Sequence, residues 1–393
     1  MTNQKTRICL IQPVQSPYWS ERLRVLADSE DLDVVLLLER GSLSHRPGWG
    51  VEKIANVKTG VLGSHLMKFK RECSDLGYRI QSVRGIPLRL PIALWRHRPD
   101  IVVVCNATQM LIALMVRPLL GFKLTLIVED TPHATRNLSK GLHLIRAWVY
   151  RRADRYFPFS EDAIEYLRSI GIVDRLSRSS WSLDMERFGK QTEGPLETQE
   201  TRVEISFVGQ FIQLKGVEKL IEAWAELPQE THERVRLSMY GTGPLRDKVM
   251  SRSNALGLTN VTFPGHAPYE EIIKALNESH LFILPTLQDL FSLTVLEAMA
   301  SSCPVITTPF NGARELIEEG RTGWIVDPTE PGALVAVLNK ALGPEIDLAA
   351  MGRAARQRVF EFDNKKVMKH FKEVLLALSD GTRVAEAGNS KTT

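Results

Sequence analysis

Two carboxylates and a helix start between them form the first group of residues that could do chemistry. Asp289 and Glu297 stand eight residues apart, and Ser292 between them is a residue type that commonly caps the start of a helix. The first N–H groups of a helix have no partner within it and can bind anions without a basic side chain. We therefore expect the backbone amides of Phe291, Ser292 and Leu293 to contact phosphate groups.

The spacing gives the two carboxylates different tasks. Glu297 lies about one turn into the expected helix, where it could accept hydrogen bonds from ribose hydroxyls. Asp289 precedes the helix, where it could accept hydrogen bonds from the hydroxyls of a sugar. Their separation makes them a poor glycosidase pair, because such a pair flanks a single bond. An ordinary helix with a solvated glutamate explains the same spacing.

A lysine follows another strand-like segment. The apolar run ending in Phe207 and Val208 leads into Gly209 and Gln210, and Lys215 precedes a helical pattern. An ammonium group there could stabilise the charge that develops on a leaving diphosphate. Gly209 would let a ligand approach the backbone. A surface lysine at a helix start is the plain alternative.

Other motifs carry less information alone. The glycine pair Gly241 and Gly243 resembles part of a dinucleotide fingerprint, but the full G-x-G-x-x-G pattern and the P-loop are absent. Gly312 follows another strand-like run, where backbone could meet a sugar. Asp31 and Asp33 resemble a metal-binding pair, yet they precede a strand, and the nine histidines lack zinc-ligand spacing. The sequence therefore predicts no metal site.

Strand-like and helical patterns alternate through both halves of the chain. The short apolar runs are typical of strands buried on both faces of a parallel sheet. They lie at 8–11, 34–38, 101–105, 124–128, 156–159, 205–208, 236–240, 261–263, 281–284, 305–308 and 324–326. This alternation predicts an α/β fold of two doubly wound, Rossmann-like domains. Ligands bind beyond the carboxyl ends of such strands, so we expect the site in a cleft between the two domains.

Composition suggests the domain limits. The predicted parts are an N-terminal domain over 1–190, a polar linker over 191–201, a second domain over 202–345, C-terminal helices over 346–380 that pack back on the N-terminal domain, and a disordered tail over 381–393. The 393 residues contain no apolar run near the ~20 residues that a membrane helix needs. The beginning of the chain shows no signal-peptide pattern, and the four cysteines are scattered. A cytoplasmic location is the expectation.

Positive charge is concentrated in the first half. Residues 51–155 carry 18 Lys and Arg against seven Asp and Glu, whereas residues 201–393 carry 21 against 24. Such a field attracts anionic partners, among them phosphate-bearing acceptors and anionic membranes. Basic residues alternate with aromatic and apolar ones at 95–98 and 146–155. We therefore expect peripheral contact with an anionic membrane, with a solvated basic surface as the alternative.

Taken in order, the motifs over about residues 203–330 resemble those of the group 1 (family four) retaining glycosyltransferases of the GT-B fold. The segment from Asp289 to Glu297 resembles the E-x7-E motif of that family, and the loop from Gly209 to Lys215 resembles its phosphate-binding loop. The resemblance implies an N-terminal acceptor domain and a C-terminal nucleotide-sugar domain. It adds the donor-binding positions Gly241, Gly243 and His266.

The sequence departs from the family pattern at several positions. The first glutamate of the motif is Asp289, and the arginine usual in the phosphate loop is Gln210. We assign Lys215, Asp289, Glu297 and Gln210 to catalysis. The family's glycine-rich acceptor loop and its histidine are also replaced. The positions expected to meet the acceptor are Tyr18, Trp19, Glu129, Asp130 and His133.

The resemblance implies transfer of a sugar from a nucleoside diphosphate donor to an acceptor hydroxyl, with anomeric retention and without metal or cofactor. A UDP-sugar is the favoured donor. A lipid-linked, lipopolysaccharide or polysaccharide acceptor at the inner face of the plasma membrane is expected, and nucleic acid is not. Alternatives are a GT-B binding or scaffold protein without catalysis, a GT-B sugar-nucleotide epimerase or phosphorylase, and a nicotinamide oxidoreductase.

Overall fold

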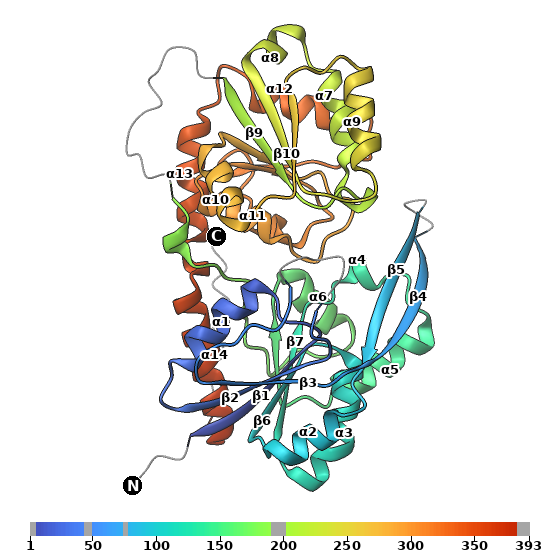
Figure 1. The fold of residues 1–393 in the computed structure, drawn as a ribbon, viewed down its shortest axis with the longest axis vertical. Coiled ribbons are helices and arrows are strands. Elements are labelled where there is room, and N and C mark those ends of the chain that lie inside the picture. The colour runs from blue at the N-terminus through green and yellow to red at the C-terminus, as the bar shows by residue number, and fades with distance from the viewer. Residues whose placement is uncertain (1–4, 43–48, 74–77, 190–201, 383–393) are drawn as a thin grey trace. The chain divides into compact units, whose positions relative to one another are not determined.

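The alternating strands and helices build one six-stranded parallel sheet in each of two units (Figure 1). The computed structural model describes residues 5–42, 49–73, 78–189 and 202–382. Unit 1 comprises the chain up to Ser182 and again from Asn364, and unit 2 comprises Leu183–Asp363. The predicted α/β class with two doubly wound domains is confirmed. The cleft between them stays a prediction.

Strands that alternate their side chains between two cores form the sheet of unit 1. Its order is β3-β2-β1-β6-β7-β8. The strands are β1 (Thr6–Gln12), β2 (Leu32–Leu38), β3 (Val57–Val61), β6 (Ile101–Val104), β7 (Lys123–Val128) and β8 (Arg155–Pro158). Successive side chains of a strand point to opposite faces. In β1, Cys9 and Ile11 therefore enter one apolar cluster, and Ile8 and Leu10 enter the other.

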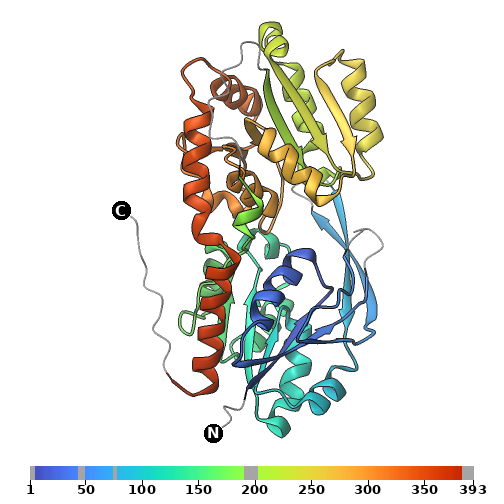
Figure 2. The same ribbon diagram turned by 60° about the vertical axis from the view of Figure 1, so that its left-hand side comes forward.

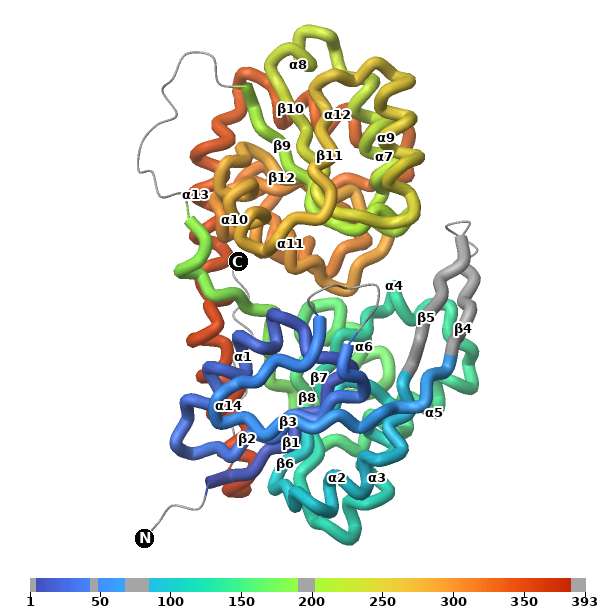
Figure 3. Tube along the Cα trace, viewed as in Figure 1, coloured from blue at the N-terminus to red at the C-terminus, as the bar shows by residue number. Residues whose placement is uncertain are grey.

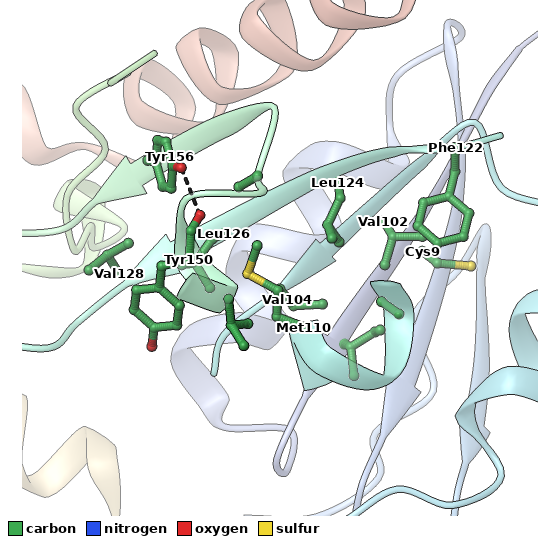
Figure 4. Close-up of a cluster of buried hydrophobic side chains, with 14 of the residues drawn as sticks. Cys9, Val102, Val104, Met110, Phe122, Leu124, Leu126, Val128, Tyr150 and Tyr156 are labelled. Atoms are coloured by element: carbon green, nitrogen blue, oxygen red, sulfur yellow. Dashed lines mark hydrogen bonds between the residues drawn. The ribbon is translucent and has the colours of Figure 1, made fainter. Parts of the chain in front are cut away.

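Helices cover both faces of this sheet. One face carries α2 (Leu90–His97), α3 (Ala107–Leu120), α5 (Lys140–Tyr150) and α6 (Glu161–Ser169). Their buried side chains close the cluster in Figure 4, where the Tyr156 hydroxyl donates to the Tyr150 carbonyl at 2.7 Å. The other face carries α1 (Pro17–Ala27) and α14 (Asn364–Ser379), and short α4 (Pro132–Thr135) follows β7. The chain thus buries the sheet on both sides.

An antiparallel hairpin accompanies unit 1. Strands β4 (His65–Cys73) and β5 (Tyr78–Ile86) pair with each other, with Leu66 opposite Gly85. No apolar run in the sequence predicted this hairpin or β3. Their segments lack the continuous apolar runs of the buried strands, because polar and basic residues interrupt them.

The sheet of unit 2 has the order β11-β10-β9-β12-β13-β14. Its strands are β9 (Val203–Val208), β10 (Val235–Tyr240), β11 (Val261–Gly265), β12 (Leu281–Ile283), β13 (Val305–Thr307) and β14 (Gly323–Ile325). Its helices are α7 (Val217–Ala225), α8 (Gln229–Arg234), α9 (Arg246–Ala255), α10 (Tyr269–Glu278), α11 (Leu293–Ala300), α12 (Ala333–Ala341) and α13 (Leu348–Val359). All six strands overlap the apolar runs that predicted them; Figure 3 labels β9, β10, β11 and β12 along the chain trace.

The C-terminal helices divide between the units, whereas all of 346–380 was predicted to pack on the N-terminal domain. Helix α13 packs against α11 within unit 2. Only α14 joins unit 1, where it runs beside α1 (Figure 2) and sets Phe371 4.4 Å from Phe157, centroid to centroid. Residues 183–189 also belong to unit 2, since the Leu183 amide donates to the Phe362 carbonyl.

Two predicted segments lie outside the residues that the structure describes, wholly or for the most part. The predicted linker 191–201 lies outside the described residues, as does the predicted tail from residue 383 onward. Across the described part of the chain, no helix combines the length and apolar character needed to cross a membrane.

Candidate functional site

Loops at the carboxyl edge of the unit 2 sheet bring most of the predicted donor residues together. Parallel strands end at one edge, so the loops after β9, β10, β12 and β13 are neighbours. The Gly209 amide donates to the Tyr240 carbonyl at 3.1 Å, and the Thr286 hydroxyl donates to the Leu214 carbonyl at 2.7 Å. These bonds join loops that are more than 30 residues apart in sequence.

The side chains of Lys215 and Asp289 form an ion pair. Lys215 ends a short 3-10 turn (Gln213–Lys215), and Asp289 is held by its own amide, which donates to the Phe310 carbonyl at 3.0 Å. The side chains are 19% and 17% exposed, so the pair lies at the surface of the site rather than inside the core. An anion that enters here meets a cation already fixed in place.

Two glycines permit the close approach of these loops. A Cβ atom on Gly241, whose φ is +128°, would stand 1.9 Å from the carbonyl oxygen of Gly209. A Cβ atom on Gly312 would stand 1.9 Å from the carbonyl oxygen of Leu290. A side chain cannot fit at either distance, so glycine at these positions lets the backbones touch.

Helix α11 begins at Leu293, one residue after the predicted cap. Ser292 occupies the cap position, but its side chain accepts no capping hydrogen bond. Its amide donates to Oδ1 of Asn311 at 3.2 Å. The prediction that this amide contacts phosphate therefore needs correction, because a buried side chain already uses it. Phe291 is buried beside it, and the amide of Leu293 opens the helix, where the first N–H groups have no partner within the helix.

Glu297 is a buried carboxylate rather than a solvated one. It is 1% exposed, and the Tyr269 hydroxyl donates to its Oε1 at 2.9 Å. Tyr269 begins α10, which follows β11 directly. A buried carboxylate needs hydrogen-bond donors, so the tyrosine fixes one oxygen of Glu297 in position.

The remaining donor predictions lie on the same edge. Gln210 follows β9, and its carbonyl accepts from the Ile212 amide at 2.9 Å. Gly243 stands in the loop after β10, and His266 is an exposed residue just after β11. Sequence reasoning missed Tyr269 and Asn311. Both act through contacts to residues 19 or more positions away, and no local motif marks them.

The predicted acceptor residues of unit 1 do not form one group. Trp19 is 4% exposed and stacks on Phe159 in the core, so it packs rather than faces an acceptor. Both oxygens of Asp130 are occupied, because Arg146 Nη1 donates at 2.8 Å and the Tyr150 hydroxyl at 2.7 Å. These two predictions therefore need correction.

The other three residues predicted to meet the acceptor follow strands of the unit 1 sheet. Glu129 follows β7 directly, Tyr18 lies in the first turn of α1, and His133 lies in α4. Burial raises the pKa of Glu129 to about 7, the charge of Arg22 opposes this rise, and that of Asp130 adds to it.

Arg22 lies in a buried aromatic cage beneath this edge. Its guanidinium carbon is 5.0 Å from the Trp19 ring, 5.2 Å from Phe159 and 4.8 Å from Trp181. Nε donates to the Ser182 hydroxyl at 3.1 Å, and that hydroxyl donates to Asn364 Oδ1 at 2.6 Å. Burial lowers the pKa of Arg22 to about 9, against the charge of Glu129. The cage therefore ties α1 to the two points where the chain leaves and re-enters unit 1.

Replacing Glu129 by glutamine should change how stability depends on pH. The folded protein holds a proton on Glu129 up to pH of about 7, above the ordinary pKa of 4.5. The free energy of unfolding of the wild type should therefore fall as pH rises from 4.5 to about 7, by up to ~1.4 kcal/mol per pH unit. Glu129→Gln should remove this contribution. Urea unfolding across that range measures it, with exposed Glu165→Gln as the control; identical slopes in all three proteins would refute the prediction.

Among the described residues, no group of three or more His, Cys, Asp or Glu side chains could hold a metal ion. Asp31 and Asp33, which resemble a metal-binding pair in sequence but were not predicted to be one, make other contacts. Asp31 accepts from Lys372, and Asp33 accepts from Arg7 and Lys58.

Known families and proteins resemble this chain. Residues 190–358 match the family profile described as "Glycosyl transferases group 1". Glycogen synthase of Mycobacterium tuberculosis is 27% identical over 257 residues, covering 63% of this chain and 59% of that protein. The putative colanic acid biosynthesis glycosyltransferase WcaL of Escherichia coli K12 is 27% identical over 240 residues, 58% of each chain. The chain thus spans less than two thirds of the length of the curated relatives it matches.

Solved structures share the architecture at lower identity. Sucrose-phosphate synthase from Thermosynechococcus elongatus has a TM-score of 0.75 at 16% identity, covering 96% of this chain and 100% of that one. Anabaena HepE in complex with UDP has a TM-score of 0.71 at 15% identity, covering 95% and 100%. At such identities the likeness shows the fold.

Proposed function

We propose that this chain is a group 1 glycosyltransferase of the GT-B fold, because residues 190–358 match that family profile and the solved structures of this fold share its architecture. In this proposal it transfers a sugar from a nucleoside diphosphate donor to an acceptor hydroxyl. The observation that carries the proposal is the ion pair of Lys215 and Asp289 beside the start of α11. It sets a cation, a carboxylate and helix N–H groups at one sheet edge, which is the equipment that a sugar diphosphate needs.

Each group has a defined task in this proposal. Lys215 neutralises the diphosphate as the bond from its oxygen to the anomeric carbon breaks. The amide of Leu293 at the start of α11 donates a hydrogen bond to the same phosphates. Asp289 accepts from donor sugar hydroxyls, and Glu297 accepts from ribose. Arrival of the diphosphate gives Lys215 a second anion, which frees Asp289 to meet the sugar.

Retention of the anomeric configuration and independence from metal are parts of the same proposal. Lys215 and backbone amides would take the charge that a divalent ion otherwise takes. We expect transfer to proceed at the same rate in the presence of a chelator. A UDP-sugar is the first donor to test, because HepE, a protein of the same fold, has been solved with UDP and with UDP-glucose.

The acceptor is proposed to be a growing polysaccharide, a lipopolysaccharide or a lipid-linked saccharide. WcaL is named for colanic acid biosynthesis, and another neighbour of the same fold, WaaG, for lipopolysaccharide biosynthesis. The basic stretch over 51–155 would suit a phosphate-bearing acceptor or an anionic surface. A cytoplasmic enzyme at the inner face of the plasma membrane fits these features.

A nucleotide panel tests the proposal. Thermal shifts with UDP, GDP, ADP, CMP and TDP, and with their sugars, should show stabilisation by one diphosphate family. The sugar nucleotide that binds should then release free nucleoside diphosphate when an acceptor is supplied. Indifference to every nucleotide would falsify the assignment.

A binding protein without catalysis is the second candidate. Gln210 and Asp289, which replace the charged arginine and the longer glutamate of the family pattern, favour it. This candidate predicts that a nucleotide still shifts the melting temperature while no donor is turned over with any acceptor. Turnover at any measurable rate excludes it.

Replacing Tyr269 by phenylalanine should weaken nucleotide binding about tenfold. The change removes the hydroxyl that donates to buried Glu297, so the carboxylate loses a fixed orientation and one hydrogen bond. Isothermal titration with the best-binding diphosphate measures the loss. Tyr156→Phe, which removes a buried hydroxyl of unit 1, is the matched control and should leave the affinity unchanged. Equal affinities of Tyr269→Phe and wild type would show that the tyrosine only fills space.

A further inference from the structure

Three neighbouring helices of unit 1 expose an apolar surface. Helix α3 packs against both α2 and α5, and all three cover the same face of the sheet (Figures 1 and 3). Nine of the 17 exposed large hydrophobic side chains in the described residues belong to these helices or directly precede them. Six of them define what we call the α2–α3–α5 face, and they are 52–72% exposed: Ile92, Trp95, Met115, Leu119, Leu144 and Trp148.

Helical spacing places these exposed residues on one side of each helix, and the buried residues lie on the side that faces the core. In α3, Met115 and Leu119 are four residues apart and point outward, while Met110 lies in the core. In α5, Leu144 and Trp148 are also four apart. A surface helix of a globular domain normally carries polar residues on its outer side. These helices are apolar on both sides, and exposed apolar patches of this kind mark interaction sites.

Charge within the three helices has one sign. The sequences of α2, α3 and α5 contain no Asp or Glu. Each of the two tryptophans carries a cation beside it, with the Arg98 guanidinium 4.7 Å from the Trp95 ring centroid and that of Arg152 3.5 Å from Trp148. Both arginines are exposed. The partner of this face should therefore be apolar within and negative at its rim.

We infer that the α2–α3–α5 face docks on an anionic phospholipid membrane. Tryptophan rings settle at the headgroup level of a bilayer, and the aliphatic side chains reach the acyl boundary below it. Arginines beside the rings meet lipid phosphates, which attract cations near the surface. A second copy of the face would set like charges against each other. The inference rests on the proposed function, since it states how the enzyme would reach an acceptor held at a membrane.

Co-sedimentation of the full chain with sucrose-loaded vesicles tests the docking. One set of vesicles contains phosphatidylcholine alone, and the other contains equal parts of phosphatidylcholine and phosphatidylglycerol. We expect binding to the anionic set only, weakened by added salt. The double variant Trp95→Ala/Trp148→Ala should bind about tenfold more weakly. Arg98→Gln/Arg152→Gln should bind more weakly and with a smaller salt dependence. Val173→Ala shortens a side chain that is 73% exposed and lies outside the face, and this variant should bind as wild type.

Several outcomes overturn the inference. The inference is refuted if the wild type binds neither vesicle type, or binds both equally. It is also refuted if the tryptophan variant is folded and binds as strongly as the wild type. Dimerisation through the tryptophans without vesicle binding would assign the face to a second copy instead. Thermal melting confirms that each variant is folded, and nucleotide thermal shifts are run on the same preparations. Nucleotide binding without vesicle binding refutes only the docking, and vesicle binding without nucleotide binding refutes only the proposed function.

Discussion

Replacing Lys215 by alanine is expected to lower kcat for sugar transfer about 100- to 1000-fold. The lysine is the cation fixed at the sheet edge beside the start of α11, and charge on the leaving diphosphate grows in the transition state. The family pattern has an arginine to share this work, but Gln210 stands in its place here. The loss should therefore fall on kcat more than on donor binding.

Steady-state kinetics with the donor found in the nucleotide panel measure this loss. Lys219→Ala is the matched control, because Lys219 is an exposed lysine one turn further along the same segment. It should retain wild-type kcat. A Lys215→Ala enzyme that keeps kcat but raises KM would assign the lysine to ground-state binding. One that keeps both constants would remove it from the site.

The second large effect concerns stability. Replacing Arg22 by alanine should lower the free energy of unfolding of unit 1 by about 3 kcal/mol. The change empties a cage of three aromatic rings and leaves the Ser182 hydroxyl and the Ser180 carbonyl without their guanidinium donor. Arg22→Met should lose less, because it keeps most of the volume and removes the cost of burying a charge.

Hydrogen exchange during urea unfolding resolves this effect, because it reports unit 1 and unit 2 separately. Arg24→Ala on the same helix is the control. Arg24 forms ion pairs with Glu21 and Glu52 at the surface, which should contribute less than about 1 kcal/mol. Equal losses for the two alanine variants would show that the cage adds nothing beyond a surface ion pair.

The sequence alone predicted the buried strands of both sheets. Continuous apolar runs such as 205–208 and 281–284 mark strands buried on both faces, and glycine marks the tight loops after them. It did not predict the hairpin of β4 and β5, because a two-stranded ribbon outside the main sheet needs no such run. Strand periodicity therefore reveals core strands and misses peripheral ones.

Side-chain partners explain the site residues that sequence reasoning misplaced. Ser292 has the right type and position for a phosphate-binding amide, but Asn311 reaches it from another loop. Asp130 stands at a strand end like an acceptor contact, but Arg146 and Tyr150 occupy it. Such pairings join residues 16 to 20 positions apart, and they depend on how helices pack. The local spacing of residues in the sequence therefore does not predict these contacts.

The division of the chain between the units has a consequence for synthesis on the ribosome. Unit 2 is one continuous segment, whereas unit 1 begins the chain and is completed only by α14. Until Met368, Phe371, Val374 and Leu375 emerge, α1 is the only described helix that covers this apolar face of the first sheet. Domains generally fold as units during translation. The segment made second should therefore become protease-resistant first, and the segment made first should wait for the last helix before it closes.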